Sequence, residues 1–255
     1  MSHVELVGIL NATPDSFSGD GVSPAGKDYV QRVLQRADHL IKSGASLIDI
    51  GAQSTRPNAE ERDVEQEWAR LGPVLPELMA RYDNKLSIDT FLPDIVHRAA
   101  ELGIFTINDV TCFNNPAMIK LATKLGLGCI VSHLPEQFGQ DIQGAHATDE
   151  LLDSMETVKS ELLARRQQMI AAGISPEKII LDPGIGFSKT PRLNQELLEF
   201  SAVLPGIPVM IGCSKKRFLG EHRMEKEPNQ AAARTAIAAG ARYLRVHNPE
   251  WYTNL

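Results

Sequence analysis

Several features that mark particular classes of protein are missing from this sequence. Cysteine occurs three times in 255 residues, at Cys112, Cys129 and Cys213, an odd number with no C-x-x-C spacing. That pattern argues against a disulfide framework and favours free thiols in a reducing compartment. Cys129 lies in an apolar run, so we expect a small core residue there rather than a nucleophile.

Targeting and membrane signals are also missing. The first residues lack a basic stretch followed by an apolar one, and no apolar run approaches the roughly 20 residues that span a bilayer. The net charge of -6 supplies neither a basic footprint for nucleic acid nor a polybasic membrane anchor. We therefore expect a cytoplasmic protein with no nucleic-acid or membrane partner, and a single domain over residues 1–255.

One repeating unit organises the chain: an amphipathic segment, a glycine, and then a short β-branched run. The glycine is typical of a helix C-cap, and the run is typical of a strand buried on both faces of a parallel sheet. Helical patterns cover 31–42, 64–81, 151–172 and 230–239. The runs predict eight strands, near 4–10, 47–51, 86–89, 104–108, 128–132, 178–182, 207–211 and 242–246.

Eight strands in strict alternation with helices predict a (β/α)₈ barrel of the α/β class. The competing fold is a doubly wound open sheet, which normally carries a Gly-rich phosphate turn after its first strand. Here the first strand runs into Asn11-Ala-Thr-Pro-Asp-Ser-Phe-Ser18 instead, so the barrel is favoured. No helical pattern after the last predicted strand is long enough for an eighth helix, so we expect that helix to be missing.

Polar side chains follow every predicted strand, where a barrel enzyme carries its chemistry. Asp89, Asn108, Asp182 and Lys216 end four different strands and converge only if the barrel closes. Their carboxylates, amide and ammonium would satisfy the edges of a flat heterocycle. Each could instead be a turn or N-cap residue, which such types often are.

Cations gather near the last two strands despite the negative net charge. Arg245 and His247 alternate onto one side of the eighth strand, and residues 214–218 read Ser-Lys-Lys-Arg-Phe. A guanidinium and an imidazolium there predict a phosphate site, in the usual place for this fold. The alternative is a solvated basic turn, which suits Lys215 and Arg217 better than Lys216.

Two segments are long enough to act as mobile lids over the barrel mouth, 11–18 and 54–57. Phe187, in a glycine-rich turn, offers a stacking face. His97 and His133 have no second ligand at metal spacing, so zinc is not expected. Mg²⁺ held mainly by phosphate oxygens and water would leave little trace in the sequence.

Seven motifs in this order resemble the dihydropteroate synthase family over nearly the whole chain. They are 8–18 (GILNATPDSFS), 48–57 (IDIGAQSTRP), 87–90 (SIDT), 107–109 (IND), 181–187 (LDPGIGF), 214–216 (SKK) and 245–247 (RVH). The resemblance implies a transferase of folate biosynthesis that joins p-aminobenzoate to 6-hydroxymethyl-7,8-dihydropterin diphosphate and is inhibited by sulfonamides. It also implies Mg²⁺, a dissociative mechanism with a pterin cation, and a possible homodimer.

The resemblance assigns roles to residues as follows. Asp89, Lys216, Arg245 and His247 would be catalytic, and Asp89, Asn108, Asp182 and Lys216 would bind the pterin. Asn11, Arg56, Arg245 and His247 would bind diphosphate, with Asn11 also on the metal. Thr55, Pro57, Phe187 and Ser214 would hold p-aminobenzoate, and Thr13, Asp15 and Phe17 would close the first loop.

The chain departs from the family pattern in its first two loops and in its last two helices. The stretch between Gly220 and Arg245 is shorter than usual, which implies a shortened seventh helix, and the eighth helix is expected to be missing. Ser18-Gly-Asp-Gly21 replaces the usual Ser-Asp-Gly-Gly, and Gln53 replaces a common Glu. Two alternatives to a synthase follow. A pterin-binding paralogue without turnover would keep the pterin pocket, and the order of Gly19 and Asp20 favours it. A methyltransferase acting between methyltetrahydrofolate and a corrinoid would have no reason to keep Lys216 with Arg245 and His247.

Overall fold

A computed structural model describes residues 4–12, 27–52 and 63–255. Eight parallel strands form one sheet in the order β6-β5-β4-β3-β2-β1-β8-β7. The strands are β1 Glu5–Asn11, β2 Leu47–Gly51, β3 Leu86–Asp89, β4 Thr106–Asp109, β5 Gly128–Ser132, β6 Ile179–Asp182, β7 Met210–Ile211 and β8 Tyr243–Val246. Each lies within two or three residues of the range that the sequence predicts.

The two ends of this sheet meet. Leu181 in β6 forms a parallel bridge with Val209, and the Leu181 amide donates to the Pro208 carbonyl at 3.0 Å. That contact joins β6 to β7 and closes the ring, so the (β/α)₈ barrel is confirmed. The open-sheet alternative is excluded for the described strands.

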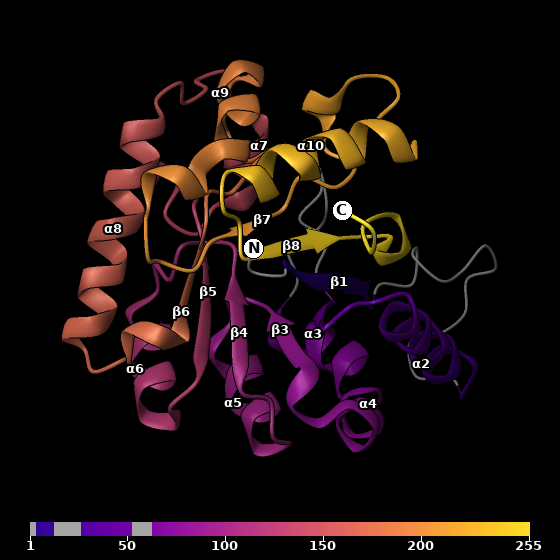
Figure 1. The fold of residues 1–255 in the computed structure, drawn as a ribbon. Helices are drawn as coiled ribbons and strands as arrows, with labels where there is room; N and C mark the ends of the chain where they lie inside the picture. Colours follow the sequence, from indigo (N-terminus) through magenta and orange to yellow (C-terminus); the bar gives the residue numbers. More distant parts are fainter. Residues whose placement is uncertain (1–3, 13–26, 53–62) are drawn as a thin grey trace.

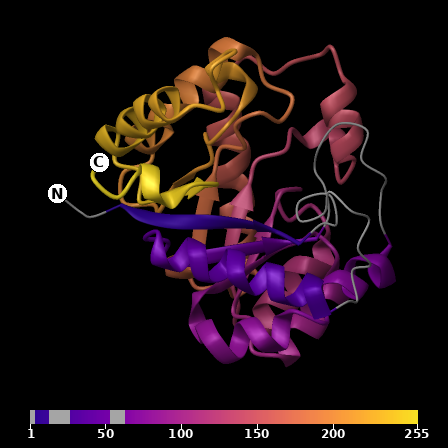
Figure 2. The same ribbon diagram turned by 90° about the vertical axis from the view of Figure 1, so that its right-hand side faces the viewer.

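Helices cover the outside of the ring (Figure 1). They are α2 Lys27–Lys42, α3 Val64–Leu71, α4 Leu75–Tyr82, α5 Pro93–Glu101, α6 Pro116–Leu125, α7 Ile142–Ala147, α8 Met155–Ala171, α9 Pro191–Glu196 and α10 Lys226–Ala238. Short 3-10 segments η1 to η6 lie at 83–85, 136–138, 176–178, 197–203, 217–219 and 249–251. In Figure 2 the helices α2, α3 and α4 lie on the opposite side of the strands from α10.

The expectation of one helix over residues 64–81 is wrong. The structure has two helices, α3 and α4, separated at Gly72 and Pro73. Proline has no N–H to donate, and its ring clashes with the carbonyl four residues earlier, so the helical hydrogen bonding stops there. The Val74 amide bonds the Leu71 carbonyl instead, in a tight turn that redirects the chain.

After β8 the described residues form η6 and a turn. This segment is well anchored. Tyr252 is buried in the main apolar cluster, and the Gln230 side chain of α10 donates to the Trp251 carbonyl. Arg36 of α2 donates to the His247 carbonyl. The segment thus connects α10 to α2.

Alternation along the strands divides the barrel interior into two levels. Val7, Ile130 and Met210 form a small buried apolar cluster at the lower level. Leu47 of β2 and Tyr243 of β8 pack against this cluster. Two residues further along the same strands, and on the same faces, are Asp49 and Arg245. The interior is therefore apolar below and charged towards the carboxyl ends of the strands, where a functional site is expected.

Candidate functional site at the mouth of the barrel

A buried network of side chains lies at the carboxyl ends of β2, β3, β4 and β8. Its centre is Asp49, which is 1% exposed and had not been identified as a site residue from the sequence. Asp49 accepts from Ser87 Oγ at 2.6 Å, from Asn108 Nδ2 at 2.8 Å and from Arg245 Nε at 2.7 Å. The signal was present in the sequence, since a carboxylate between Ile48 and Ile50 on a buried strand must have partners.

Arg245 joins this network to Asp89. Its Nη2 donates to Asp89 Oδ2 at 2.6 Å while its Nε holds Asp49. Burial alone would lower the pKa of Arg245, but the two carboxylates outweigh burial and raise it. Burial raises the pKa of Asp89, with Asp49 adding to the effect and Arg245 opposing it. Arg245 is therefore a fixed cation inside the mouth, held by two acids that the sequence had not paired with it.

Asp182, Lys216 and Phe187 lie together on the adjoining side of the mouth. Asp182 Oδ1 accepts from the Gly184 amide at 2.7 Å, and the Lys216 ammonium lies 5.0 Å from the centre of the Phe187 ring. Burial raises the pKa of Asp182, although the Gly184 amide and nearby cations oppose this. Burial and the charge of Arg245 lower the pKa of Lys216 to about 8, so the ammonium form prevails at neutral pH.

A glycine joins the two halves of the mouth. A Cβ built on Gly212 would lie 3.6 Å from Asp182 Oδ2 and 3.9 Å from Arg245 Cβ, so both side chains flank this position. The electrostatic influence of Arg245 on Asp182 and on Lys216 agrees with that proximity. The structure thus brings together Asp89, Asn108, Asp182, Lys216 and Arg245, as the barrel prediction requires.

His247 contacts Ser214 rather than the acids. Its amide donates to Ser214 Oγ at 3.3 Å, and its Nδ1 lies 3.0 Å from the same oxygen. In the tautomer with the ring proton on Nε2, the Ser214 hydroxyl accepts from the amide and donates to Nδ1. Burial, followed by the charges of Lys215 and Arg245, lowers the pKa of His247 to about 3. The lowered pKa argues against the imidazolium that we expected from the sequence.

Lys215 belongs to the periphery of this site. It has a φ of +59° and places its ammonium 5.5 Å from the centre of the Trp251 ring. Its amide donates to the buried Asn229 side chain at 2.8 Å, which fixes the turn after β7. This arrangement differs from the freely solvated turn that the sequence allowed.

Asn11 ends β1 and is partly exposed. Six other predicted site residues lie outside the described part of the chain, namely Thr13, Asp15, Phe17, Thr55, Arg56 and Pro57, as do Gln53 and the Gly19-Asp20 pair. Their roles stay predictions. Among the described residues, no group of three or more His, Cys, Asp or Glu side chains could hold a metal.

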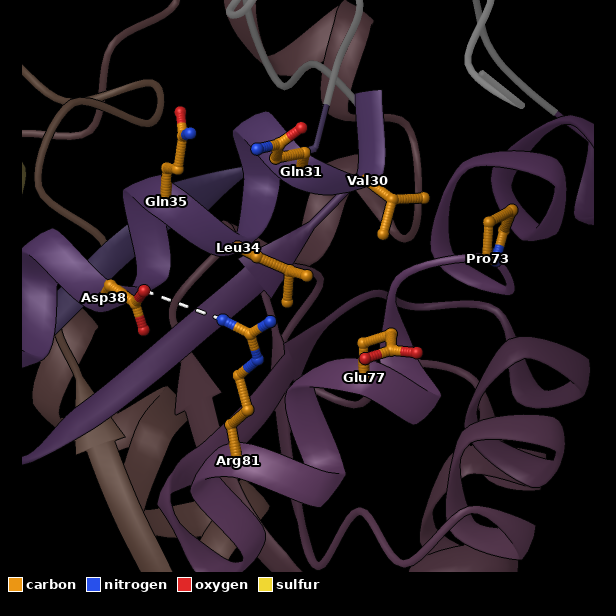
Figure 3. Close-up of a pocket in the computed structure, with 8 residues that line it drawn as sticks. All are labelled: Val30, Gln31, Leu34, Gln35, Asp38, Pro73, Glu77 and Arg81. Carbon is orange, nitrogen blue, oxygen red and sulfur yellow. Dashed lines mark ion pairs between the residues drawn. The ribbon is translucent and has the colours of Figure 1, made fainter. Parts of the chain in front are cut away.

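A separate hollow of about 660 Å³ lies on the outer flank of the barrel (Figure 3). It is lined by residues of α2 and α4, with Asp38 and Arg81 paired across it at 3.6 Å. None of the polar groups of the barrel mouth lines it. It is an open groove between neighbouring helices, so we place the functional site at the mouth. No helix in the described segments is long and apolar enough to cross a membrane.

Comparison with known proteins shows which family the chain resembles. Residues 7–247 match the pterin binding enzyme family. The dihydropteroate synthase of Escherichia coli strain K12 is 34% identical over 97% of this chain and 88% of its own length. A Xanthomonas albilineans dihydropteroate synthase structure with 4-aminobenzoic acid has a TM-score of 0.84 at 33% identity, covering 99% of this chain and 90% of that one. A Yersinia pestis dihydropteroate synthase in complex with a sulfonamide drug has a TM-score of 0.84 at 32% identity, with coverages of 99% and 92%.

Proposed function

The chain belongs to the dihydropteroate synthase family of pterin-binding enzymes, and we propose that its barrel mouth carries out that synthesis. The enzyme is a transferase of folate biosynthesis. It joins p-aminobenzoate to 6-hydroxymethyl-7,8-dihydropterin diphosphate, giving 7,8-dihydropteroate and diphosphate. The observation that supports this most directly is the convergence of Asp89, Asn108, Asp182 and Lys216 from four strand ends on one polar interior.

These four side chains form the proposed pterin pocket. A pterin edge alternates ring nitrogens with amino and carbonyl groups, and needs acceptors beside donors. Asp89 and Asp182 supply carboxylate acceptors, Asn108 an amide and Lys216 an ammonium. Asp49 and Ser87 complete the pocket indirectly. They fix the Asn108 amide nitrogen, so that its oxygen, which has no partner in the described structure, is left for a ligand.

The proposed mechanism is dissociative. The bond from the pterin methylene carbon to the diphosphate oxygen breaks, and both electrons leave with the oxygen. The buried carboxylates favour the positive charge that develops on the pterin, while Lys216, Arg245 and the Nε2–H of His247 favour the departing anion. The amine nitrogen of p-aminobenzoate then forms the C–N bond and loses one proton to diphosphate or solvent. No covalent intermediate with the enzyme is needed.

Phe187 and Ser214 are the described part of the proposed p-aminobenzoate site. The Phe187 ring lies beside Lys216, where an aromatic acid could stack against it, and Ser214 connects this region to His247. Thr55 and Pro57 would complete the site, while Arg56 would reach the diphosphate and Thr13, Asp15 and Phe17 would close over it. A sulfonamide, which resembles p-aminobenzoate in shape and charge, would compete there.

Mg²⁺ is the cofactor we propose. The amide oxygen of Asn11, at the end of β1, is the kind of hard donor that this ion takes. Phosphate oxygens and water would supply the remaining ligands, which fits the lack of a carboxylate cluster among the described residues. When bound, the ion would offset negative charge on the diphosphate.

The state of the protein in the cell is also a proposal. We propose a cytoplasmic enzyme of one domain, with small-molecule substrates and no nucleic-acid or membrane partner, consistent with the net charge of -6. A homodimer stays a prediction, and sedimentation velocity at micromolar concentration would test it.

Diphosphate release tests the function. Purified protein with the pterin diphosphate and Mg²⁺ should release diphosphate, and it should form dihydropteroate when p-aminobenzoate is also present in the reaction. Lys216→Ala should weaken pterin binding, and Arg245→Ala should weaken binding of the diphosphate ester more than that of the unesterified pterin.

Tight pterin binding without turnover would overturn the proposal in favour of the paralogue that lacks activity. The relatives described above are synthases, which does not favour the methyltransferase alternative.

A further inference from the structure

Lys189 is a buried cation to which the proposed chemistry assigns no part. It lies in the turn between β6 and α9 and is 4% exposed. Its ammonium donates to three backbone carbonyls, those of Gly184 at 2.9 Å, Phe187 at 3.0 Å and His133 at 3.3 Å. A buried ammonium must satisfy three protons, and here each has an acceptor.

The turn that Lys189 holds has an unusual backbone. Gly184, Gly186 and Ser188 have φ values of +64°, +91° and +47°, a region that glycine adopts readily but that disfavours other residues such as Ser188. The Lys189 ammonium contacts carbonyls near both ends of this turn and a third at the end of β5. It therefore fixes the turn against the neighbouring strand at a point where the backbone alone would relax.

Two residues of the proposed pterin pocket depend on the same turn. The Gly184 amide donates to Asp182 Oδ1 at 2.7 Å, and the Phe187 ring lies beside the Lys216 ammonium. Lys189 holds the carbonyls of Gly184 and Phe187, so its removal would free both contacts at once.

The charge of Lys189 also reaches the acid in this pocket. Burial raises the pKa of Asp182, and Lys189 is one of the cations that oppose the rise. Burial lowers the pKa of Lys189 itself to about 7, and the charge of Asp182 opposes that fall. The other titratable groups packed around Lys189 come from four further elements of the barrel, namely Lys216, Cys112, Glu161 and His133.

We propose that Lys189 is a positioning residue for the pterin. It acts through the β6–α9 turn, whose carbonyls it holds, and so keeps Asp182 and Phe187 directed towards the pocket. This inference rests on the proposed function, because it assumes that Asp182 binds a pterin.

The test measures binding of 6-hydroxymethyl-7,8-dihydropterin, without diphosphate or Mg²⁺, by calorimetry between pH 5 and 9. Lys189→Met removes the charge and keeps the length, and we expect it to weaken binding about tenfold or more, the effect of losing charge-assisted hydrogen bonds. Lys178→Met is the matched control, because Lys178 also donates to a carbonyl, that of Gly126, but is exposed and lies before β6 rather than after it. Its affinity should stay at the wild-type value.

The pH profile separates positioning from general loss of structure. Asp182 must be ionised to accept from the pterin, so affinity falls as acid protonates it. Without the Lys189 charge the pKa of Asp182 should rise further. The loss of pterin affinity at acid pH, called the acid fall below, should therefore move to higher pH in Lys189→Met. Lys189→Arg keeps the charge and should keep the wild-type position of that fall.

The outcomes are distinct. Failure of the wild-type protein to bind the pterin would contradict the proposed function itself. Wild-type binding with an unchanged affinity and pH profile in folded Lys189→Met would overturn only the role of Lys189. If Lys189→Met does not fold, Lys189→Gln takes its place. If neither folds, Lys189→Arg decides: a folded Arg variant with a shifted acid fall would overturn the inference, and an unshifted one would support it.

Discussion

Asp49 shows at the scale of one residue how a buried charge organises the site. It accepts three side-chain hydrogen bonds, and Arg245 depends on it for one of its two carboxylate partners. Removing one member of a buried pair leaves the other charge uncompensated, which costs far more than the pair contributes by itself. Asp49 is therefore structural and electrostatic support for the residues that meet the ligand.

Asp49→Ala should lower the free energy of unfolding by about 3–5 kcal/mol, because Arg245 and Asn108 lose a buried acceptor. Urea denaturation at pH 7 would measure it. The control is Glu5→Ala, which removes the partner of the exposed Arg242 at 3.8 Å. That change should cost less than about 1 kcal/mol, and equal losses in both variants would contradict the central place of Asp49.

His133 predicts an acid limit to stability. Burial and the charge of Lys189 lower its pKa from 6.5 to about 4 in the folded protein, although its Nε2 lies 3.0 Å from Glu161. The unfolded chain therefore takes up the proton first as pH falls below 6.5, so stability is lost between pH 6.5 and 4. The loss from this residue should reach about 2 kcal/mol at pH 5.

His133→Gln should flatten that part of the profile, measured as urea midpoints from pH 7 to pH 5. His222→Gln serves as the control, since His222 is exposed. If the slope were the same in wild type and His133→Gln, a buried neutral His133 would not be the cause.

At the scale of elements, the turn between β6 and α9 is the most constrained part of the mouth. A Cβ on Gly184 would lie 2.0 Å from the His133 carbonyl oxygen, and its φ of +64° already disfavours other residues. Gly184→Ala should destabilise the protein by about 3 kcal/mol or more, from the clash and the backbone strain together. Gly206 has a φ of +81° with open space around it, so Gly206→Ala should cost only about 1 kcal/mol. Thermal unfolding of the two variants would compare them.

The elements themselves were largely predictable, because buried parallel strands and glycine-capped helices leave strong local patterns. All eight strands were found from β-branched runs, and the helix over residues 64–81 failed only because Gly72 and Pro73 were read through. Candidate site residues were found from their position after each strand. The hydrogen-bond partners of these residues were not predicted. The pairing of Arg245 with Asp49 and Asp89 depends on closure of the barrel, which brings together residues far apart in the sequence. Protonation states were missed too, since burial, which sets the pKa of His247, is not a local property.

On the scale of the whole molecule, the segment after β8 contributes to the main apolar core. Tyr252 is 2% exposed within the main apolar cluster. Tyr252→Ala should therefore cost about 3–5 kcal/mol, as for other buried aromatic side chains. Phe105→Ala is the comparison, because Phe105 is 56% exposed and should contribute little. Similar midpoints in guanidinium chloride for the two variants would mean that the flank is sealed by other residues.

The two levels of the barrel interior also have a kinetic consequence. Val7, Ile130 and Met210 fill the interior away from the carboxyl ends of the strands, so among the described residues the polar part of the interior opens towards those ends. In the proposed arrangement, a pterin beside Asp89 and Asp182 would lie deeper than a p-aminobenzoate stacked on Phe187. The pterin would then have to bind first, and the product would have to leave before the next pterin enters.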